Sequence, residues 1–464
     1  MKILKGLLIT LTALSLQSCF VAKEYSRPEQ LVDEHLFRTD QLPQDSLSMA
    51  QVSWKELFTD PILQNYIEEG LENNMDIRMA LQQMEIANAY FKQGKAGYFP
   101  VLNANATAAH QELSESSQMG RQISSVNQFE ISGGLSWEAD IWGKIRSNKR
   151  ASEAGYLQSV AAHQAVKSRL IANIASIYYQ LMALDEQISV TEATINTRTE
   201  SLETTRALKD AGNVTEVGVK QTEAQVYTAQ AILVDLKNQV RLLENTFSIL
   251  LGSEPRDIER SSFDNQDIST SLQTGVPSEL LSNRPDVMAA EFGLINAFEM
   301  TNVARSNFYP SLTLTASGGF QSVELDQLFN TGSLFANVIG GLAQPILNGR
   351  RIKTQYEAAQ AQQEQALIQF KFALLNAGKE VSDALSSIDA AEEKIDIKEK
   401  ENDAYQLASE YSQELLNNGF GNYLEVLTAQ ERALSSNLDM INAKNARMQA
   451  IIDLYEALGG GWQE

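Results

Sequence analysis

Two stretches of the chain, 149–211 and 350–418, dominate its pattern of hydrophobic and polar positions. Each holds more than sixty residues, no proline and a single glycine. In the first, residues recur at alternating three- and four-residue steps: Ile174, Ile177, Leu181, Leu184, Ile188, Thr191 and Ile195. This heptad spacing keeps one narrow apolar seam toward a neighbouring helix, as in a coiled coil. At about 1.5 Å per residue, sixty-odd residues form a helix about 95 Å long.

Each long helix is followed by a second heptad pattern, which predicts a helix that returns along the first. The first return seam consists of Val226, Ala229, Leu233, Leu236, Val240, Leu243, Phe247 and Leu250, and the second of Leu434, Leu438, Ile441, Met448, Ile452 and Tyr455. The remaining faces of these helices are mostly small or polar. Narrow seams with wet faces favour the wall of a hollow tube, because a solid core requires a wider apolar stripe.

Four segments alternate between apolar and polar residues, as β-strands do: 101–111, 129–137, 311–321 and, less regularly, 333–343. Strands of about ten residues with one apolar and one polar face are typical of membrane β-barrels. Each segment alone also suits a soluble hairpin. Flanked by very long helices, the four predict two membrane hairpins, at about 101–137 and 311–343. We expect Leu314 to face lipid and Thr313 to face the pore.

The chain is internally duplicated, because landmarks of its first half recur about 207 positions later, with Gly212 matching Gly419 and Gly252 matching Gly459. Each half reads as helix, hairpin, long helix, tight turn and long helix. The first helix is expected over 54–93, opening near Asp60, which can cap it. The predicted domains are a signal peptide at 1–18, an arm at 19–53, a first repeat at 54–252, a linker at 253–278 and a second repeat at 279–464.

Four strands per chain imply assembly, because an open sheet edge cannot lie in lipid. Bacterial barrels begin at about eight strands, and eight leave no channel. Three copies would supply twelve strands, and small homo-oligomers are usually closed rings. The pattern of strands therefore predicts a trimer.

The start of the chain is typical of an exported lipoprotein. Lys2 and Lys5 precede the apolar segment 7–16, which is too short to span a bilayer. The residues that follow, 16–19 (LQSC), have the form of a lipoprotein signal, with Cys19 as the lipid acceptor. Cys19 is the only cysteine, so a disulfide within the chain is excluded. A plain secretory signal with an incidental cysteine is the alternative.

The net charge of −22 argues against nucleic-acid binding, which requires a basic surface. The acidic residues suit either a solvated surface or a lumen that favours cations. The three histidines, His35, His110 and His163, are far apart and show no metal-ligand spacing. The sequence carries no recognisable catalytic or nucleotide-binding motif. We therefore expect neither an enzyme nor a bound metal or cofactor.

Several motifs resemble those of the outer membrane factors of bacterial efflux and secretion, specifically the lipoprotein (OprM/NodT-like) branch of the TolC family. The motifs are 25–28 (YSRP), 57–61 (LFTDP), 74–78 (NMDIR), 283–287 (NRPDV), 423–427 (YLEVL) and 457–462 (ALGGGW). The resemblance implies a mostly α fold with a small membrane β part. A trimer would form a twelve-helix periplasmic tunnel and a twelve-stranded barrel in the outer membrane. A collar, to which the linker 253–278 contributes, would surround the tunnel.

The resemblance also implies a function. The chain would be the passive outer-membrane duct of a tripartite efflux system, driven by an inner-membrane pump through a periplasmic adaptor. A duct for type I protein secretion is the alternative within transport. A lipid-anchored periplasmic coiled-coil scaffold is the alternative from another class, and it requires no strands in the membrane.

Two tight turns, at 210–213 and 417–421, lie at the ends of the rods far from the strands, and Gly212, Gly419 and Gly421 supply the helix-ending glycines. By resemblance, this tip closes the tunnel and contacts the adaptor. The family places acidic residues at positions matching Glu425 and Thr428, so here only Glu425, helped by Glu216 in the other half, can form an acidic ring. Alternatively, Glu425 only occupies a solvated helix start.

Overall fold

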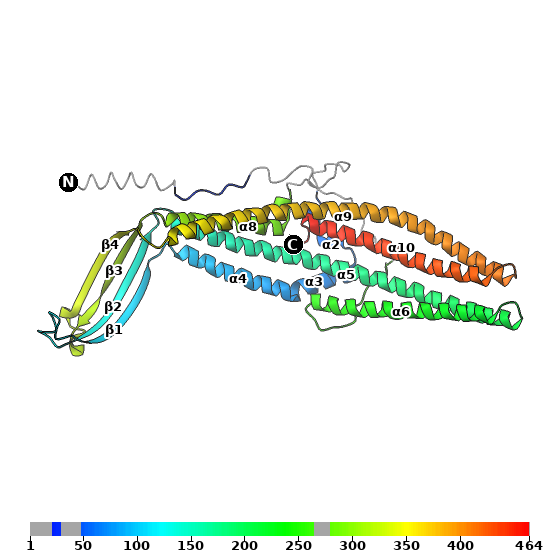
Figure 1. The fold of residues 1–464 in the computed structure, drawn as a ribbon, viewed down its shortest axis with the longest axis horizontal. Helices are drawn as coiled ribbons and strands as arrows, with labels where there is room; N and C mark the ends of the chain where they lie inside the picture. The colour runs from blue at the N-terminus through cyan, green and yellow to red at the C-terminus, as the bar shows by residue number, and fades with distance from the viewer. Residues whose placement is uncertain (1–20, 29–47, 264–278, 464) are drawn as a thin grey trace. The chain divides into compact units, whose positions relative to one another are not determined.

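The computed structural model describes residues 21–28, 48–263 and 279–463. Within these ranges the chain is mostly helical, with one four-stranded sheet (Figure 1). The main elements are α2 (Trp54–Leu57), α3 (Pro61–Asn73), α4 (Met75–Ala96), β1 (Val101–Glu112), β2 (Ser125–Ala139), α5 (Lys144–Asp210), α6 (Glu216–Leu250), α7 (Leu280–Asn283), α8 (Pro285–Ser306), β3 (Ser311–Ser322), β4 (Leu334–Ala343), α9 (Arg351–Asn417) and α10 (Tyr423–Leu458). No helix in the described ranges has both the length and the apolarity needed to cross a bilayer.

Residues 54–93 are mainly helical as expected, but they form three helices, α2, α3 and α4, and not one. Asp60 begins α3 as expected, since its Oδ1 accepts a hydrogen bond of 2.8 Å from the N–H of Ile62. Asn74 separates α3 from α4. Its Oδ1 accepts from the N–H of Asp76, and its Nδ2 donates to the carbonyl of Leu250, both at 2.8 Å. Asn74 therefore begins one helix and fixes the end of another.

The two long helices are present, since α5 and α9 each contain 67 residues. In the half of the bundle that holds the tight turns, side-chain pairs set the order of the helices as α6, α5, α10, α9. The pairs are Lys237 with Glu192 between α6 and α5, Gln187 with Asn442 between α5 and α10, and Lys398 with Asp439 between α9 and α10. The flanking helices are therefore α6 and α9.

The predicted return seams are the buried stripes of their helices. Val226, Ala229, Leu236 and Phe247 are buried in α6, and Leu434, Ile441, Met448, Ile452 and Tyr455 in α10. The middle of α5 differs from the expected narrow seam. Between 168 and 184, twelve of the seventeen residues are buried, including Tyr178 and Tyr179. The reason is that other segments cover α5 here, since Tyr179 also packs against Phe58 in the link between α2 and α3.

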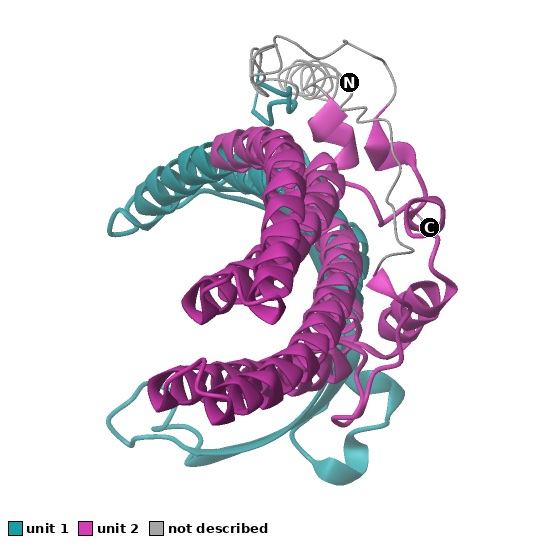
Figure 2. Ribbon diagram, turned by 90° about the vertical axis from the view of Figure 1, so that its right-hand side faces the viewer, with its two compact units in different colours: residues 1–29, 84–159, 290–370 teal, residues 30–83, 160–289, 371–464 magenta. Residues whose placement is uncertain are grey.

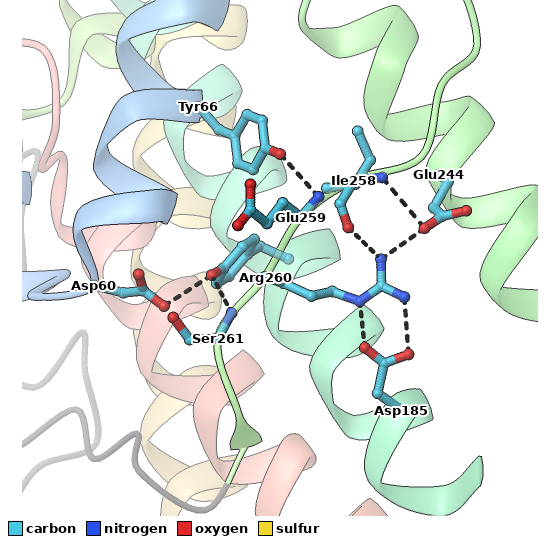
Figure 3. Close-up of polar contacts among 9 residues, drawn as sticks. Asp60, Tyr66, Asp185, Glu244, Ile258, Glu259, Arg260 and Ser261 are labelled. Atoms are coloured by element: carbon cyan, nitrogen blue, oxygen red, sulfur yellow. Dashed lines mark hydrogen bonds and ion pairs between the residues drawn. The ribbon is translucent and has the colours of Figure 1, made fainter. Parts of the chain in front are cut away.

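The segment 253–263, the described part of the linker, is bound to this covered part of α5 (Figure 3). Arg260 forms a bidentate ion pair with Asp185 of α5 and a second pair of 2.7 Å with Glu244 of α6. Two tyrosine hydroxyls hold the backbone on either side of Arg260. The hydroxyl of Tyr66 accepts a hydrogen bond of 3.0 Å from the N–H of Glu259, and the hydroxyl of Tyr178 accepts one of 3.0 Å from the N–H of Ser261. The linker therefore cross-braces α3, α5 and α6.

The chain divides into two compact units, drawn in teal and magenta in Figure 2. The first comprises residues 1–29, 84–159 and 290–370, and it holds the whole sheet and most of α8. The second comprises 30–83, 160–289 and 371–464, and it holds α3, α6 and α10. Both halves of the duplicated sequence contribute to each unit, so the repeats are intertwined.

The four strands form one antiparallel sheet in the order β1-β2-β3-β4. The two predicted hairpins are therefore both present, and they join side by side through β2 and β3. The register pairs Leu102 with Leu135, Trp137 with Leu314, and Leu314 with Gly340. This register determines which residues share a face of the sheet.

Candidate functional site: a two-faced sheet and two helical tips

One face of the sheet is apolar across all four strands. Since directly opposed residues share a face, the register brings every predicted apolar position to the same side. This face contains Leu102, Ala104, Ala106 and Ala108 of β1, Phe129, Ile131, Leu135 and Trp137 of β2, Leu312, Leu314, Ala316 and Phe320 of β3, and Leu334, Ala336, Val338 and Leu342 of β4. Many of these side chains are exposed, so the face has no covering layer within the described chain.

The opposite face is polar on β1, β2 and β3 and mixed on β4, where Phe335 and Ile339 lie among small and polar residues. Its polar members include Asn103, Asn105, Thr107 and Gln111 of β1, Gln128, Glu130, Ser132, Ser136 and Glu138 of β2, Ser311, Thr313, Thr315, Ser317 and Gln321 of β3, and Asn337 of β4. One apolar and one polar face is the arrangement of a strand that separates lipid from water.

The arm residues 21–28 lie along α8 in the opposite direction to the helix. The contacts join Val21 to Arg305, Lys23 to Asn302, Tyr25 to Phe298 and Arg27 to Glu291. The strongest is the bidentate pair of Arg27 with Glu291, at 2.6 and 2.7 Å. Burial, together with the Glu291 carboxylate, raises the pKa of Tyr25 to about 12. Together these contacts hold the arm along α8 from Arg305 to Glu291.

The start of the arm lies at the end of the sheet where the helices begin. A Cβ on Gly143, in the turn from β2 to α5, would lie 2.9 Å from the Cβ of Ala22. In the same turn, Trp142 donates a hydrogen bond of 2.7 Å to the carbonyl of Pro310 and packs on Tyr309 at a centroid distance of 4.9 Å. Aromatic residues of this kind gather where barrel strands leave the membrane.

Cys19 lies outside the described residues, so its place as the lipid acceptor stays a prediction from the sequence.

Both tight turns have the geometry expected of glycine. Gly212 and Gly419 adopt positive φ angles of 83° and 79°, which an L side chain rarely adopts. The turn around Gly419 is followed by a second glycine for a different reason. A Cβ on Gly421 would lie 2.6 Å from the backbone nitrogen of Leu416, so only glycine lets the chain pass the end of α9.

The two acidic residues expected at the tips have different surroundings. Glu216, in the first turn of α6, pairs with Lys209 at 3.2 Å, and this hydrogen bond raises the pKa of Lys209. Glu425, in the first turn of α10, is exposed and has no ion-pair partner in the part of the chain that the structure describes. Of the two, Glu425 is therefore the one whose charge is uncompensated.

The sequence did not predict two contacts that join the helical hairpins near the tips. Tyr423 of α10 lies against Gly218 of α6, where a Cβ would be 3.4 Å from its ring. Arg198 of α5 is buried and donates to the carbonyls of Gln225 and Gln430, on α6 and α10. Burial lowers the pKa of its guanidinium, and nearby Glu431 opposes that effect. Arg198 lies three residues after Ile195 and continues the heptad of α5, so the spacing marked it as a seam position, but its charge argued against burial.

Two of the recognised motifs contact each other. Arg284 of the 283–287 motif donates to the carbonyl of Ala457 at 2.9 Å, and Trp462 donates to the carbonyl of Asn283 at 2.7 Å. Arg284 also forms a bidentate pair with Asp286, at 2.9 and 2.7 Å, and a bond of 2.5 Å to Glu380 of α9. The motif therefore holds the end of α7 and the start of α8 against α9 and the end of α10.

Comparison with known proteins identifies the class to which this arrangement belongs. The chain matches the family described as Outer membrane efflux protein twice, over residues 66–253 and 276–460. The chain belongs to the outer membrane efflux protein family. The two matches, one in each half, agree with the internal duplication.

Individual members of the outer membrane efflux protein family are similar over nearly the whole chain. The solvent efflux pump outer membrane protein SrpC of Pseudomonas putida is 29% identical over 90% of this chain and 89% of its own. The probable outer membrane lipoprotein SilC of Salmonella typhimurium is 27% identical, over 96% of both. The solved open state of the MtrE outer membrane channel of Neisseria gonorrhoeae is 27% identical, with a TM-score of 0.85, over 96% of this chain and 99% of that one.

The family confirms the main conclusions from the sequence. This outer membrane efflux protein is mostly helical with four strands in each chain, as predicted. It is a channel component of an efflux system in the outer membrane and not an enzyme. The roles of Cys19 and of the tip residues are not tested by these likenesses and stay predictions.

Proposed function

We propose that three copies of this chain form a lipid-anchored exit duct, which passes small molecules outward when an inner-membrane pump delivers them through a periplasmic adaptor. The observation that carries the proposal is the two-faced sheet. Its apolar face suits the lipid of the outer membrane, its polar face suits a water-filled lumen, and four strands cannot close alone. The helices would continue the lumen through the periplasm.

The flanking helices supply the surface for closing the ring. Both α6 and α9 carry large apolar side chains that are exposed in the single chain. On α6 these are Tyr227, Val234, Leu242 and Ile249, which recur every seven or eight residues, and on α9 they include Phe372, Leu375, Ile397, Leu407, Tyr411 and Leu415. This exposed apolar seam lies apart from the one that α6 already buries, and at heptad spacing it requires another helix to cover it. The α6 seam of one copy would pack against the α9 seam of the next, and three copies would give twelve helices.

The tips would form the mouth that the adaptor meets. Polar contacts join the hairpins there, including Gln430 with Ser201 at 3.1 Å and Ser201 with Gln413 at 3.2 Å. Such contacts can be exchanged for water, and regions with few buried apolar contacts open at low cost in free energy. The two helical hairpins can therefore separate at the tip, whereas the buried middle of α5 and the linker bound to it should stay rigid.

Lipid on Cys19 would add a second attachment to the membrane. Cells grown with a fatty-acid probe should label the wild-type chain and not Cys19→Ala, because the chain has no other cysteine. The mutant should still sediment with the outer membrane once it assembles, since the barrel itself is held by lipid. Equal labelling of the two proteins would remove Cys19 from the anchor.

Glu425 would form a ring of carboxylates at the closed mouth. Reconstituted trimers should conduct weakly and be blocked further by divalent cations. Glu425→Gln should raise the half-blocking concentration about tenfold, because a divalent ion loses a nearby opposite charge. Glu216→Gln is the matched control and should change the block much less, since Lys209 already compensates Glu216. Equal effects of the two substitutions would assign Glu425 to the solvated helix start instead.

Efflux and protein secretion can be separated in cells that lack the gene. Loss of an efflux duct should raise the accumulation of small solvents, cations or drugs and leave the secretion of proteins unchanged. Complementation with the gene should return the accumulation to the wild-type level. The likeness to the solvent efflux protein SrpC makes organic solvents the first compounds to test. A defect confined to protein export would favour the type I secretion duct, and no transport defect would favour a scaffold.

A further inference from the structure

The charges on the strands are all of one sign. None of the four strands contains a lysine or an arginine, whereas β1 and β2 contain Glu112, Glu130 and Glu138. The alternation places Glu112 with the apolar face, at the end of β1, and the other two glutamates on the polar face. The polar face therefore carries two carboxylates and no cation of its own.

Only one of these two carboxylates is left uncompensated. Glu138, near the helix end of β2, receives hydrogen bonds of 3.0 and 3.2 Å from Nζ of Lys144 at the start of α5. Glu130 accepts a hydrogen bond of 2.7 Å from the hydroxyl of Ser132. Its cross-strand neighbours are Thr107 and Gln321, and no described lysine or arginine lies within ion-pair distance of it.

Glu130 also lies in the half of the sheet that is farther from the helices. Nine residues separate it from Ala139, where β2 ends and the helical part follows, and at about 3.3 Å per residue this is about 30 Å. With the helices in the periplasm, Glu130 lies toward the outer mouth of the lumen.

We propose that Glu130 makes the outer mouth of the duct selective for cationic over anionic solutes. This rests on the proposed trimer, in which three copies of Glu130 face one lumen. This ring of three Glu130 carboxylates differs from the proposed Glu425 ring at the tip, because the lumen around Glu130 would be wider. A wide lumen leaves water and salt between the charges, so the selectivity should be strong at low ionic strength and weak at high ionic strength.

The test uses thiol reagents that reach the Glu130 ring through the outer mouth of the lumen. The result therefore does not require the helical tip to be open. Thr107→Cys places a thiol directly opposite Glu130. The full-length trimer is treated with a cationic and an anionic methanethiosulfonate reagent, and each rate is normalised to that of a free thiol. The parent protein, which holds only Cys19, gives the background. We expect the cationic reagent to react faster.

Adding Glu130→Gln to Thr107→Cys should lower the ratio of cationic to anionic rates about tenfold at 10 mM salt, as expected for unit charges about 6 Å apart in water. At 1 M salt the difference should largely disappear, since the Debye length is then about 3 Å. At Asn103→Cys, about 13 Å along β1, the same substitution should change the ratio less than about threefold. Glu112→Gln, which removes an equal charge from the other face, should leave the ratio unchanged.

A Thr107→Cys trimer that reacts with both reagents, with a ratio that Glu130→Gln does not change, would overturn the selectivity role. A different result would overturn the lumen itself. If Ala106→Cys reacts with these hydrophilic reagents and Thr107→Cys does not, the polar face does not line water, and the proposed duct is wrong.

Discussion

Val234→Lys should leave the purified protein mainly monomeric. Val234 is 67% exposed in the single chain, and it lies in the middle of the α6 seam that we assign to the neighbouring copy. Losing a buried valine costs about 1.5–3 kcal/mol at each interface, and burying an ammonium without a partner adds to this cost. The ring contains three such interfaces, so the loss is repeated in each trimer. Light scattering after size-exclusion chromatography in detergent measures the outcome.

Gln239→Lys provides the matched control. It places the same charge on an exposed position of the same helix, about 140° around the axis from Val234. We expect it to remain trimeric. A trimeric Val234→Lys, or loss of the trimer in both variants, would show that the exposed seam of α6 is not the contact between copies.

Arg284→Met should destabilise the fold by about 3 kcal/mol at neutral pH. The substitution leaves Asp286 and Glu380 without their shared partner, and breaking a buried ion pair costs about 3–5 kcal/mol. The lower end applies, because the side chains of these carboxylates are 42% and 40% exposed and can recover water. Denaturant unfolding of detergent-solubilised protein measures the change.

The loss should depend on pH. Burial alone would raise the pKa of Asp286, but the hydrogen bonds from Arg284 outweigh it and hold the pKa below its usual value. A carboxyl with a lowered pKa contributes stability above its unfolded pKa and loses it as the pH falls. The difference between wild type and Arg284→Met should therefore shrink as the pH falls below about 4.

Arg169→Met tests the same cavity without breaking a buried pair. Arg169 lines the cavity of about 370 Å³ beside Arg284, but its side chain is 72% exposed and lies 3.8 Å from Glu456. We expect a change below about 1 kcal/mol, as for other exposed pairs. A cost equal to that of Arg284→Met would mean that net charge in the cavity, and not the buried ion pair, stabilises this region.

The sequence predicted elements wherever one regular period governs the burial. The α6 seam is an example, because its buried residues Val226, Ala229, Leu236 and Phe247 follow the heptad. The strands are another, since alternation alone placed Leu314 and Thr313 on opposite faces. The turn glycines followed from their conformation, and Gly212 and Gly419 have the expected positive φ.

The sequence did not predict features that depend on contacts between distant segments. Tyr178 is buried because the linker and the start of α3 cover it, and its hydroxyl bonds to Asp60 and Ser261. Arg198 is buried because the carbonyls of two other helices meet it. The 283–287 and 457–462 motifs were recognised separately, but their mutual contact through Arg284 and Trp462 is a property of the fold.

The docking of the arm on α8 imposes an order on biogenesis. Arg27 and its partner Glu291 are 264 residues apart, and Val21 and Arg305 are 284 apart. During export the arm leaves the inner membrane first, and its binding surface does not exist until more than half of the chain has followed. A contact between such distant residues forms late, because a long loop must close before it. The arm can therefore dock only after the chain has been exported as far as Arg305, so docking is a late step in the assembly of the protomer.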